Sequence, residues 1–190
     1  MATALVSDVL DEVSKDLFDA GRQRWVIADL LDYINRGVRE IFNSDPTAFT
    51  VVDTVTANAG VSRTSIYSGD QPAVLLNVVG LRQLNEATLA AEDPAWELAT
   101  ASEVDGYIVK PEDYRQMFFY PSPLVDTGYI VTVGTLPEEY TDVTDPLVIK
   151  DEYVPTLHNF VMAAAYLREG AGQNLDKAAA YDTAYKKGLE

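Results

Sequence analysis

Few residues in this sequence have the types and spacing that catalysis or metal binding requires. His158 is the single histidine, so neither a paired-histidine metal site nor an HExxH motif is possible. A lone histidine can act as general base for a serine or threonine nucleophile, but the chain has no GxSxG motif to present one. We therefore interpret His158 as a packing or helix-surface residue.

Carboxylates are abundant but poorly placed for acid–base work. Glu138-Glu139 and Asp151-Glu152 are adjacent pairs, and neighbours in a helix or strand do not face one another, whereas a glycosidase needs two carboxyls across a cleft. The chain also lacks cysteine and a GxxxxGK[ST] phosphate loop. The sequence predicts no catalytic, cofactor-binding or metal-binding residue, and hence a protein that is not an enzyme and needs no cofactor.

The charge balance favours some partners over others. The 190 residues include 14 Lys and Arg, 30 Asp and Glu and one His, for a formal net charge of −16. Nucleic acid and anionic lipid bind through cations, so such a surface repels both. The acidity serves solubility alone, or it keeps the surface from adhering to DNA. The two most apolar runs, 73–81 and 160–167, are too short to span a membrane, and the N-terminus lacks the pattern of a signal peptide.

Helical periodicity marks both ends of the chain. Residues 4–20 and 26–43 each carry one apolar stripe at helical spacing, with Gly21 as the stop of the first helix and Gly37 as a close packing point in the second. Asp151 is expected to cap a third helix that ends at Gly170 and Gly172, and Asn174 to cap a fourth.

The middle of the chain changes to β-type patterns. Five runs read as strands, while residues 92–105 suggest a short helix near Trp96. The strand runs are 49–56, 61–67, 107–110, 116–120 and 129–135. The apolar run 75–81 is short, and we interpret it as a buried strand.

The order of these elements predicts an α+β fold. Helices of this length with one apolar stripe need partners, so we expect residues 1–46 and 146–190 to form one discontinuous four-helix bundle. Residues 47–145 then form an inserted, mainly β domain. The period changes near Pro46 and again near Pro146.

Tyrosine is the residue type that most suggests an interface. Seven of the eleven tyrosines lie from Tyr120 onward, and tyrosine combines a large apolar area with a polar tip. In the last helix Tyr181, Tyr185 and Leu189 share one face. This stripe docks either on the chain's own helix within 151–169 or on a neighbouring protein; we predict the latter.

Four features in order resemble the head-to-tail connector, or adaptor, proteins of tailed bacteriophages, particularly short-tailed ones. They are the N-terminal helix followed by Trp25, Leu30-Leu31 and Ile34-Asn35; Trp96 followed by Gly106-Tyr107; FFYPSP and YIVTVGT at 118–123 and 129–135; and the closing stretch from Asp145. Together they cover nearly the whole chain.

The resemblance implies a structural virion protein with no catalysis. It implies a homo-oligomeric ring of twelve copies at the head–tail junction, between the portal protein and the tail nozzle protein, with the C-terminal part engaging the portal. The chain would be made in the host cytoplasm and line the channel through which the genome is ejected. A negative wall lets DNA pass without specific binding, and no membrane is involved.

Two other classes stay open. One is a different phage tail or head-completion ring protein, and the other is a small acidic hydrolase or ligand-binding domain. Native mass separates the ring proteins from the last class, and electron micrographs locate the ring.

Overall fold

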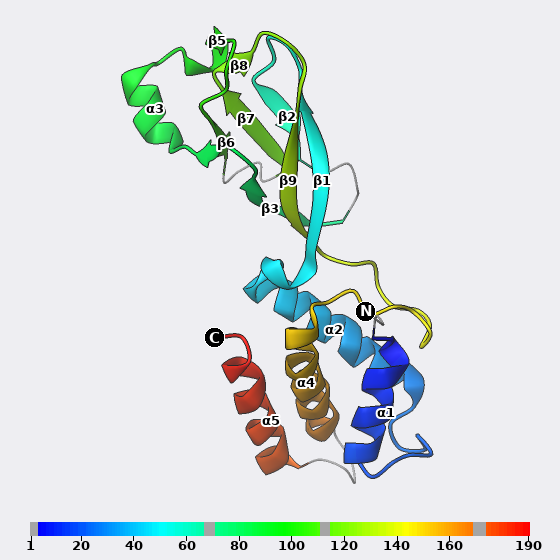
Figure 1. Ribbon diagram of the computed structural model, residues 1–190. Helices are drawn as coiled ribbons and strands as arrows, with labels where there is room; N and C mark the ends of the chain where they lie inside the picture. The colour runs from blue at the N-terminus through cyan, green and yellow to red at the C-terminus, as the bar shows by residue number, and fades with distance from the viewer. Residues whose placement is uncertain (1–3, 67–70, 111–114, 169–173) are drawn as a thin grey trace. The chain divides into compact units, whose positions relative to one another are not determined.

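The chain folds into helices and strands that divide between two compact units. The computed structural model describes residues 4–66, 71–110, 115–168 and 174–190 (Figure 1). One unit comprises residues 1–49 and 136–190, and the other residues 50–135. The first is helical and the second mainly β, so the predicted α+β class is confirmed.

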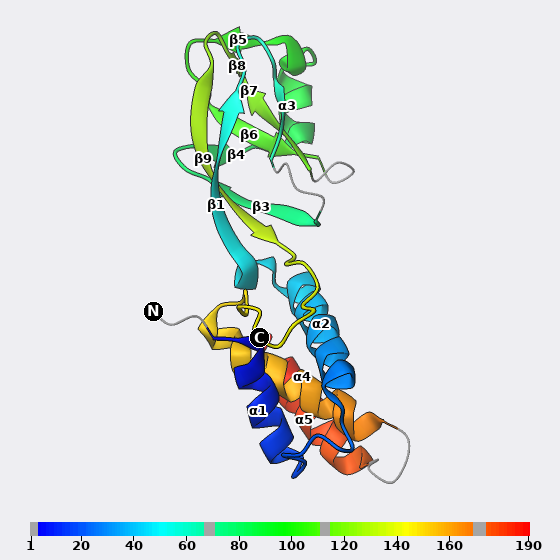
Figure 2. The same cartoon turned by 90° about the vertical axis from the view of Figure 1, so that its right-hand side faces the viewer.

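The helical unit is built around α4. Its helices are α1 (Val6–Asp16), α2 (Ile27–Ser44), α4 (Val154–Leu167) and α5 (Leu175–Lys187), with single 3-10 turns at Pro46–Phe49 and Asp151–Tyr153. Helix α4 contacts α1, α2 and α5, and it lies between α1 and α5 in Figure 1. Figure 2 shows the same four helices turned by 90°. The fully buried side chains of this unit come mostly from these helices: Val6, Leu10, Leu30, Ile34, Ile41, Leu157 and Met162.

Helix α1 ends earlier than its apolar stripe predicts. It stops at Asp16 rather than at Gly21, because Phe18 adopts a positive φ of 57° and the chain turns there. Glycine usually takes this left-handed conformation, which is why Gly21 was the expected stop. The turn leaves Phe18 outside the helix.

Helix α4 also begins differently from the prediction. Asp151 lies in the 3-10 turn and does not cap α4, whose N-cap position is Tyr153 with no side-chain hydrogen bond. The missing donor of Pro155 is tolerated because it falls in the first turn. The described part of α4 ends at Leu167, and Gly170 and Gly172 lie outside the described residues. The predicted cap of α5 is confirmed, since Asn174 Oδ1 accepts from the N–H of Lys177 at 2.9 Å.

Gly37 is a close packing point between α2 and α4, as predicted. A Cβ at this position would lie 2.7 Å from Leu157 Cδ1 and 2.8 Å from Phe160 Cδ1. Both distances are shorter than real carbon contacts, so the two helices approach this closely only because residue 37 has no side chain.

Replacing Gly37 by Val is expected to destabilise the helical unit by about 2 kcal/mol, because overpacking a filled core costs about 1–3 kcal/mol. Urea unfolding followed by circular dichroism measures the change. Gly21→Ala is the matched control, since its Cβ would meet only ordinary contacts at 3.7 Å or more. An unchanged midpoint for Gly37→Val would contradict the packing argument.

The segment 136–148 joins the helices through backbone and side-chain hydrogen bonds. Asn35 and Tyr140 exchange two bonds, from Asn35 Nδ2 to the Tyr140 carbonyl at 3.0 Å and from the Tyr140 N–H to Asn35 Oδ1 at 2.8 Å. The N–H of Val6 donates to the Asp145 carbonyl, and that of Leu147 to the Ala4 carbonyl. Residues 136–145, which the sequence pattern assigned to the β domain, therefore belong with the helices.

A carboxylate and a phenol tie the end of α2 to the start of α4. The Tyr153 hydroxyl donates to Asp45 Oδ2, and the Thr47 hydroxyl donates to Asp45 Oδ1 at 2.7 Å. The bond from Tyr153, followed by that from Thr47, lowers the pKa of Asp45. The same contact with Asp45 is the main reason that the pKa of Tyr153 is raised.

Stability is expected to fall at both ends of the pH range through this pair. Asp45, with its lowered pKa, stabilises the fold above its unfolded pKa of about 4 and loses that contribution as the pH falls through its folded pKa. Tyr153, with its raised pKa, stabilises the fold below its unfolded pKa of about 10 and loses it as the pH rises through its folded pKa. Tyr153→Phe should lower the free energy of unfolding near neutral pH by about 1 kcal/mol. In a plot of melting temperature against pH, the acid and alkaline limbs of the variant should be flatter than those of the wild type. Limbs as steep as those of the wild type would contradict this.

The β unit contains three small sheets. The first has the order β1-β9-β3, with β1 (Thr50–Ala57) and β3 (Ala73–Val78) both antiparallel to β9 (Thr127–Thr135). The second has the order β2-β7-β6-β4, from β2 (Arg63–Ser65), β7 (Gln116–Tyr120), β6 (Gly106–Val109) and β4 (Arg82–Gln83). The third pairs β5 (Thr100–Ala101) with β8 (Ser122–Pro123) in parallel.

All six runs read as strands contain a strand close to the expected place; in the run 61–67 it is the short β2, and Tyr67 lies outside the described residues. The two-residue strands β4, β5 and β8 were not predicted, because so short a run has no period.

The expected helix at 92–105 is displaced. Helix α3 spans Glu86–Glu92, and Trp96 begins a 3-10 turn, Trp96–Leu98.

The β unit has a core of its own. Val55, Val131, Val133, Met117 and Phe119 are buried together between the strands. A second cluster forms around Trp96, whose ring meets Phe118 edge-on with centroids 5.8 Å apart. Each unit therefore contains one of the two tryptophans, Trp25 or Trp96.

Candidate protein-interaction surfaces

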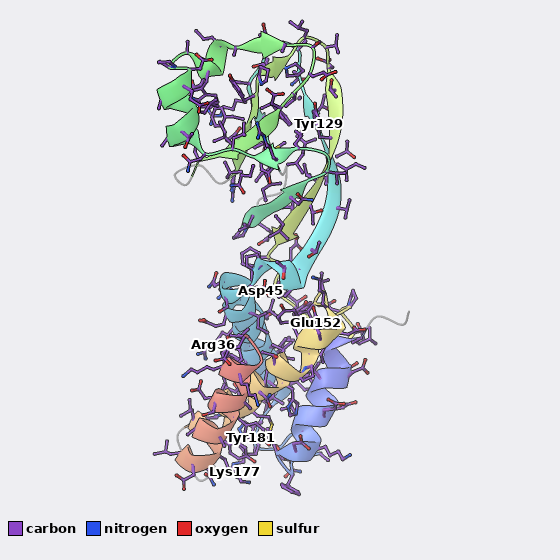
Figure 3. The ribbon with its side chains drawn as sticks, turned by 60° about the vertical axis from the view of Figure 1, so that its left-hand side comes forward. Arg36, Asp45, Tyr129, Glu152, Lys177 and Tyr181 are labelled. Carbon is purple, nitrogen blue, oxygen red and sulfur yellow. The ribbon has the colours of Figure 1, made fainter. Side chains whose placement is uncertain are left out.

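The predicted interface stripe on α5 makes contacts within its own chain. Tyr185 is 8% exposed and meets the ring of Phe160 on α4 edge-on, with centroids 5.2 Å apart. Tyr181 stacks on Tyr166 at 5.9 Å, and Leu189 is half-buried. Figure 3 shows Tyr181 on α5 with Lys177 one turn before it. The structure thus provides the stripe with a partner on α4; contact of Tyr181, Tyr185 or Leu189 with another protein stays a prediction.

The residues considered for chemistry are scattered. His158 Nε2 on α4 lies 3.2 Å from Asp16 Oδ2 at the end of α1, and Glu139 pairs with Arg39 at 2.6 Å. Asp151 and Glu152 lie in the 3-10 turn before α4. Within the described ranges no three His, Asp or Glu side chains are arranged to hold a metal ion. None of the described helices is long and apolar enough to cross a membrane.

An apolar groove runs over α4 between α2 and α5. Its floor is formed by α4, and its two sides by Tyr33 and Arg36 of α2 and by Asp182 of α5. Figure 3 labels Arg36 on α2. The floor residues are Phe160, Ala163, Ala164, Leu167 and Arg168, and the volume is about 330 Å³. The small side chains of Ala163 and Ala164 make this hollow, and Leu167 is 54% exposed beside it.

Arg36 is the cation that the groove leaves unpaired. Arg168 is paired with Asp29 and Asp182 with Lys186, but Arg36 forms no ion pair with any residue that the structure describes. Its guanidinium lies 6.0 Å from the Tyr33 ring. The groove therefore combines an apolar floor with an available positive charge.

A second surface feature is the loop between α1 and α2. Phe18 is 91% exposed, the most exposed large apolar side chain in the described part of the chain. Its φ of 57° and that of Arg22, 49°, lie in a region that non-glycine residues rarely adopt. Such conformations persist only where surrounding contacts hold them.

Those contacts come from the loop's own polar groups. The carboxylate of Asp19 accepts three backbone N–H bonds, from Gln23 at 3.1 Å, Arg24 at 2.9 Å and Trp25 at 3.0 Å. The bond from Trp25 is the largest reason that the pKa of Asp19 is lowered. Arg22 donates to Ser14 Oγ at 3.1 Å and pairs with Asp11. These hydrogen bonds fix the loop on both sides of Phe18, whose side chain is exposed to solvent.

Sequence reasoning missed both features. Phe18 lies within the run 4–20 that the sequence pattern predicts to be helical, and no pattern in 154–167 distinguishes Ala163 and Ala164 from core alanines. The one available signal was the cluster of acidic and basic residues from Asp11 to Arg22.

The comparison with known families decides what kind of protein carries these surfaces. The family described as SU10 adaptor protein matches residues 4–190, nearly the whole chain. The chain belongs to the SU10 adaptor protein family. A search of curated proteins finds no match.

Family membership agrees with the resemblance to phage head-to-tail adaptors that the sequence shows. This member of the family is accordingly a structural adaptor protein of a bacteriophage and a component of the virion. Membership of this adaptor family implies association with portal and tail proteins.

Proposed function

We propose that this adaptor-family protein forms a ring that joins the portal protein to the tail nozzle protein and lines the channel through which DNA leaves the head. The family match over residues 4–190 is the observation that carries the proposal. The helical unit, with its four helices acting as one bundle, is the rigid support, and the β unit is the second contact region. Twelve copies is the number that the resemblance suggests.

The composition supports a conduit. Each copy has a net charge of −16, and a ring multiplies that charge around one channel. A negative wall repels phosphate, so DNA slides past without being held. The proposal includes no enzymatic activity, because the residues considered for chemistry lie apart: His158 Nε2 lies 3.2 Å from Asp16 Oδ2, whereas Glu139 pairs with Arg39.

Complementation of adaptor-deficient heads tests the function. DNA-filled heads that carry the portal but lack this chain are incubated with purified protein, and attachment is followed by sedimentation and electron microscopy. We expect a ring at the portal vertex and, once nozzle protein is added, particles that eject DNA. A ring at the far end of a tail would support the alternative tail or head-completion role. Failure to join any particle would contradict both.

A further inference from the structure

We propose that Phe18 of one copy inserts into the α2–α4–α5 groove of the next copy, so that this contact links neighbours in the ring. The inference rests on the proposed function and names the residues through which copies meet. It joins two surface features of the helical unit, an exposed aromatic side chain in a hydrogen-bonded loop and an open apolar groove.

The sizes agree. The groove has a volume of about 330 Å³, and a cavity of about 150 Å³ is enough to hold a benzene ring. Its lining supplies the rings of Tyr33 and Phe160, and aromatic rings attract one another edge-to-face. Phe18 is held away from its own core by the Asp19 bonds, so little conformational freedom is lost when it docks.

The charges beside Phe18 and in the groove are of opposite sign. Two copies at −16 each repel, so they can approach only where the local charges are not alike. Asp16 and Asp19 flank Phe18 in the sequence, whereas the groove offers the unpaired Arg36. An arginine beside an inserted ring also adds a cation–π attraction of about 0.5–2 kcal/mol.

The positions allow one copy to use both surfaces at once. The groove is lined by α2, α4 and α5 and by no residue of α1 or of the loop that carries Phe18. A contact between two different surfaces is heterologous. Repeated from copy to copy, it forms a closed ring when the rotations between neighbours complete a full turn. A ring is the assembly that the proposed function requires.

Cysteine cross-linking tests the contact directly, because the natural chain has no cysteine. Phe18→Cys and Ala164→Cys are prepared as separate variants, bound together to portal-bearing heads, and treated with a short bis-maleimide. We expect cross-linked dimers in the mixture and none with either variant alone. A chain carrying both substitutions should give a ladder of higher oligomers. The control pairs Leu98→Cys, 83% exposed in the β unit, with Ala164→Cys and should not cross-link.

Substitutions measure the energetic role of the contact. Phe18→Ala should leave the melting temperature unchanged, because the side chain is exposed, yet reduce ring formation on heads at least tenfold. Phe18→Tyr should restore most of it. Arg36→Gln should weaken assembly, while Arg39→Gln, which removes an exposed arginine paired with Glu139, should not.

The outcomes separate the two proposals. If the wild-type chain fails to join heads, the proposed function fails and this inference fails with it. If the wild type joins heads but the cysteine mixture does not cross-link, or Phe18→Ala assembles as well as the wild type, the inference is overturned and the adaptor function stands.

Discussion

Deleting residues 174–190 is expected to destabilise the helical unit by several kcal/mol. The deletion removes buried Ala178 and Tyr185, and it exposes Phe160 and Tyr166, on which α5 packs. Burying each large apolar side chain contributes about 1.5–3 kcal/mol. The single change Tyr185→Ala should cost about 3 kcal/mol.

Urea unfolding monitored through Trp25, in a Trp96→Phe background, measures this loss in the unit concerned. Lys187→Ala is the control on the exposed side of α5 and should change stability by less than about 0.5 kcal/mol. A truncated chain with wild-type stability would show that α5 contributes little to the fold, and would support the prediction that its stripe serves a neighbour. A truncated chain that still joins heads to tails would exclude that role.

Replacing Gly106 by Ala is expected to destabilise the β unit by about 2–3 kcal/mol. A Cβ there would lie 2.6 Å from the carbonyl oxygen of Arg82 and 2.7 Å from Leu84 Cγ. The Arg82 carbonyl is main chain in β4, which pairs with β6 directly opposite Gly106, so it cannot rotate away as a side chain could. The parallel pair β4–β6 should therefore separate at this point.

Gly128→Ala provides the matched control in the same unit. Its Cβ would meet only Thr54 Cγ2 at an ordinary 3.7 Å, so the change should be neutral or stabilise by up to about 1 kcal/mol through the unfolded chain. Fluorescence of Trp96 in a Trp25→Phe background reports on this unit. Equal stability of the two alanine variants would contradict the argument from the Arg82 carbonyl.

The predicted and observed elements differ where a few residues override a pattern. Helix α1 was expected to reach Gly21, yet one positive φ at Phe18 ends it at Asp16. Segment 136–145 has no helical period and was assigned to the β domain, but the two bonds between Asn35 and Tyr140 attach it to α2. Those partners are 105 residues apart, a separation over which periodicity carries no information.

The candidate site was the least predictable part. Tyr181, Tyr185 and Leu189 share a helix face, and that face was visible in the sequence. The sequence did not show which surface this face covers, because an apolar stripe indicates that a helix packs without identifying its partner. The structure assigns it Phe160 and Tyr166 of α4.

The sequence alone determined the α+β class, the order of helices, strands and helices, the cap at Asn174 and the close packing at Gly37. Each depends on local spacing or on one residue's own conformational preference, which are properties of a short stretch of chain. Its overall pattern also sufficed to indicate the adaptor family. Only the tertiary structure decided that Phe18 is held in solvent and that α2 and α5 leave a groove over Ala163 and Ala164. The groove results from contacts between segments distant along the chain, because the packing of whole helices sets which side chains meet there. The loop is held by hydrogen bonds among residues 4 to 11 positions apart, and no periodic pattern encodes these bonds.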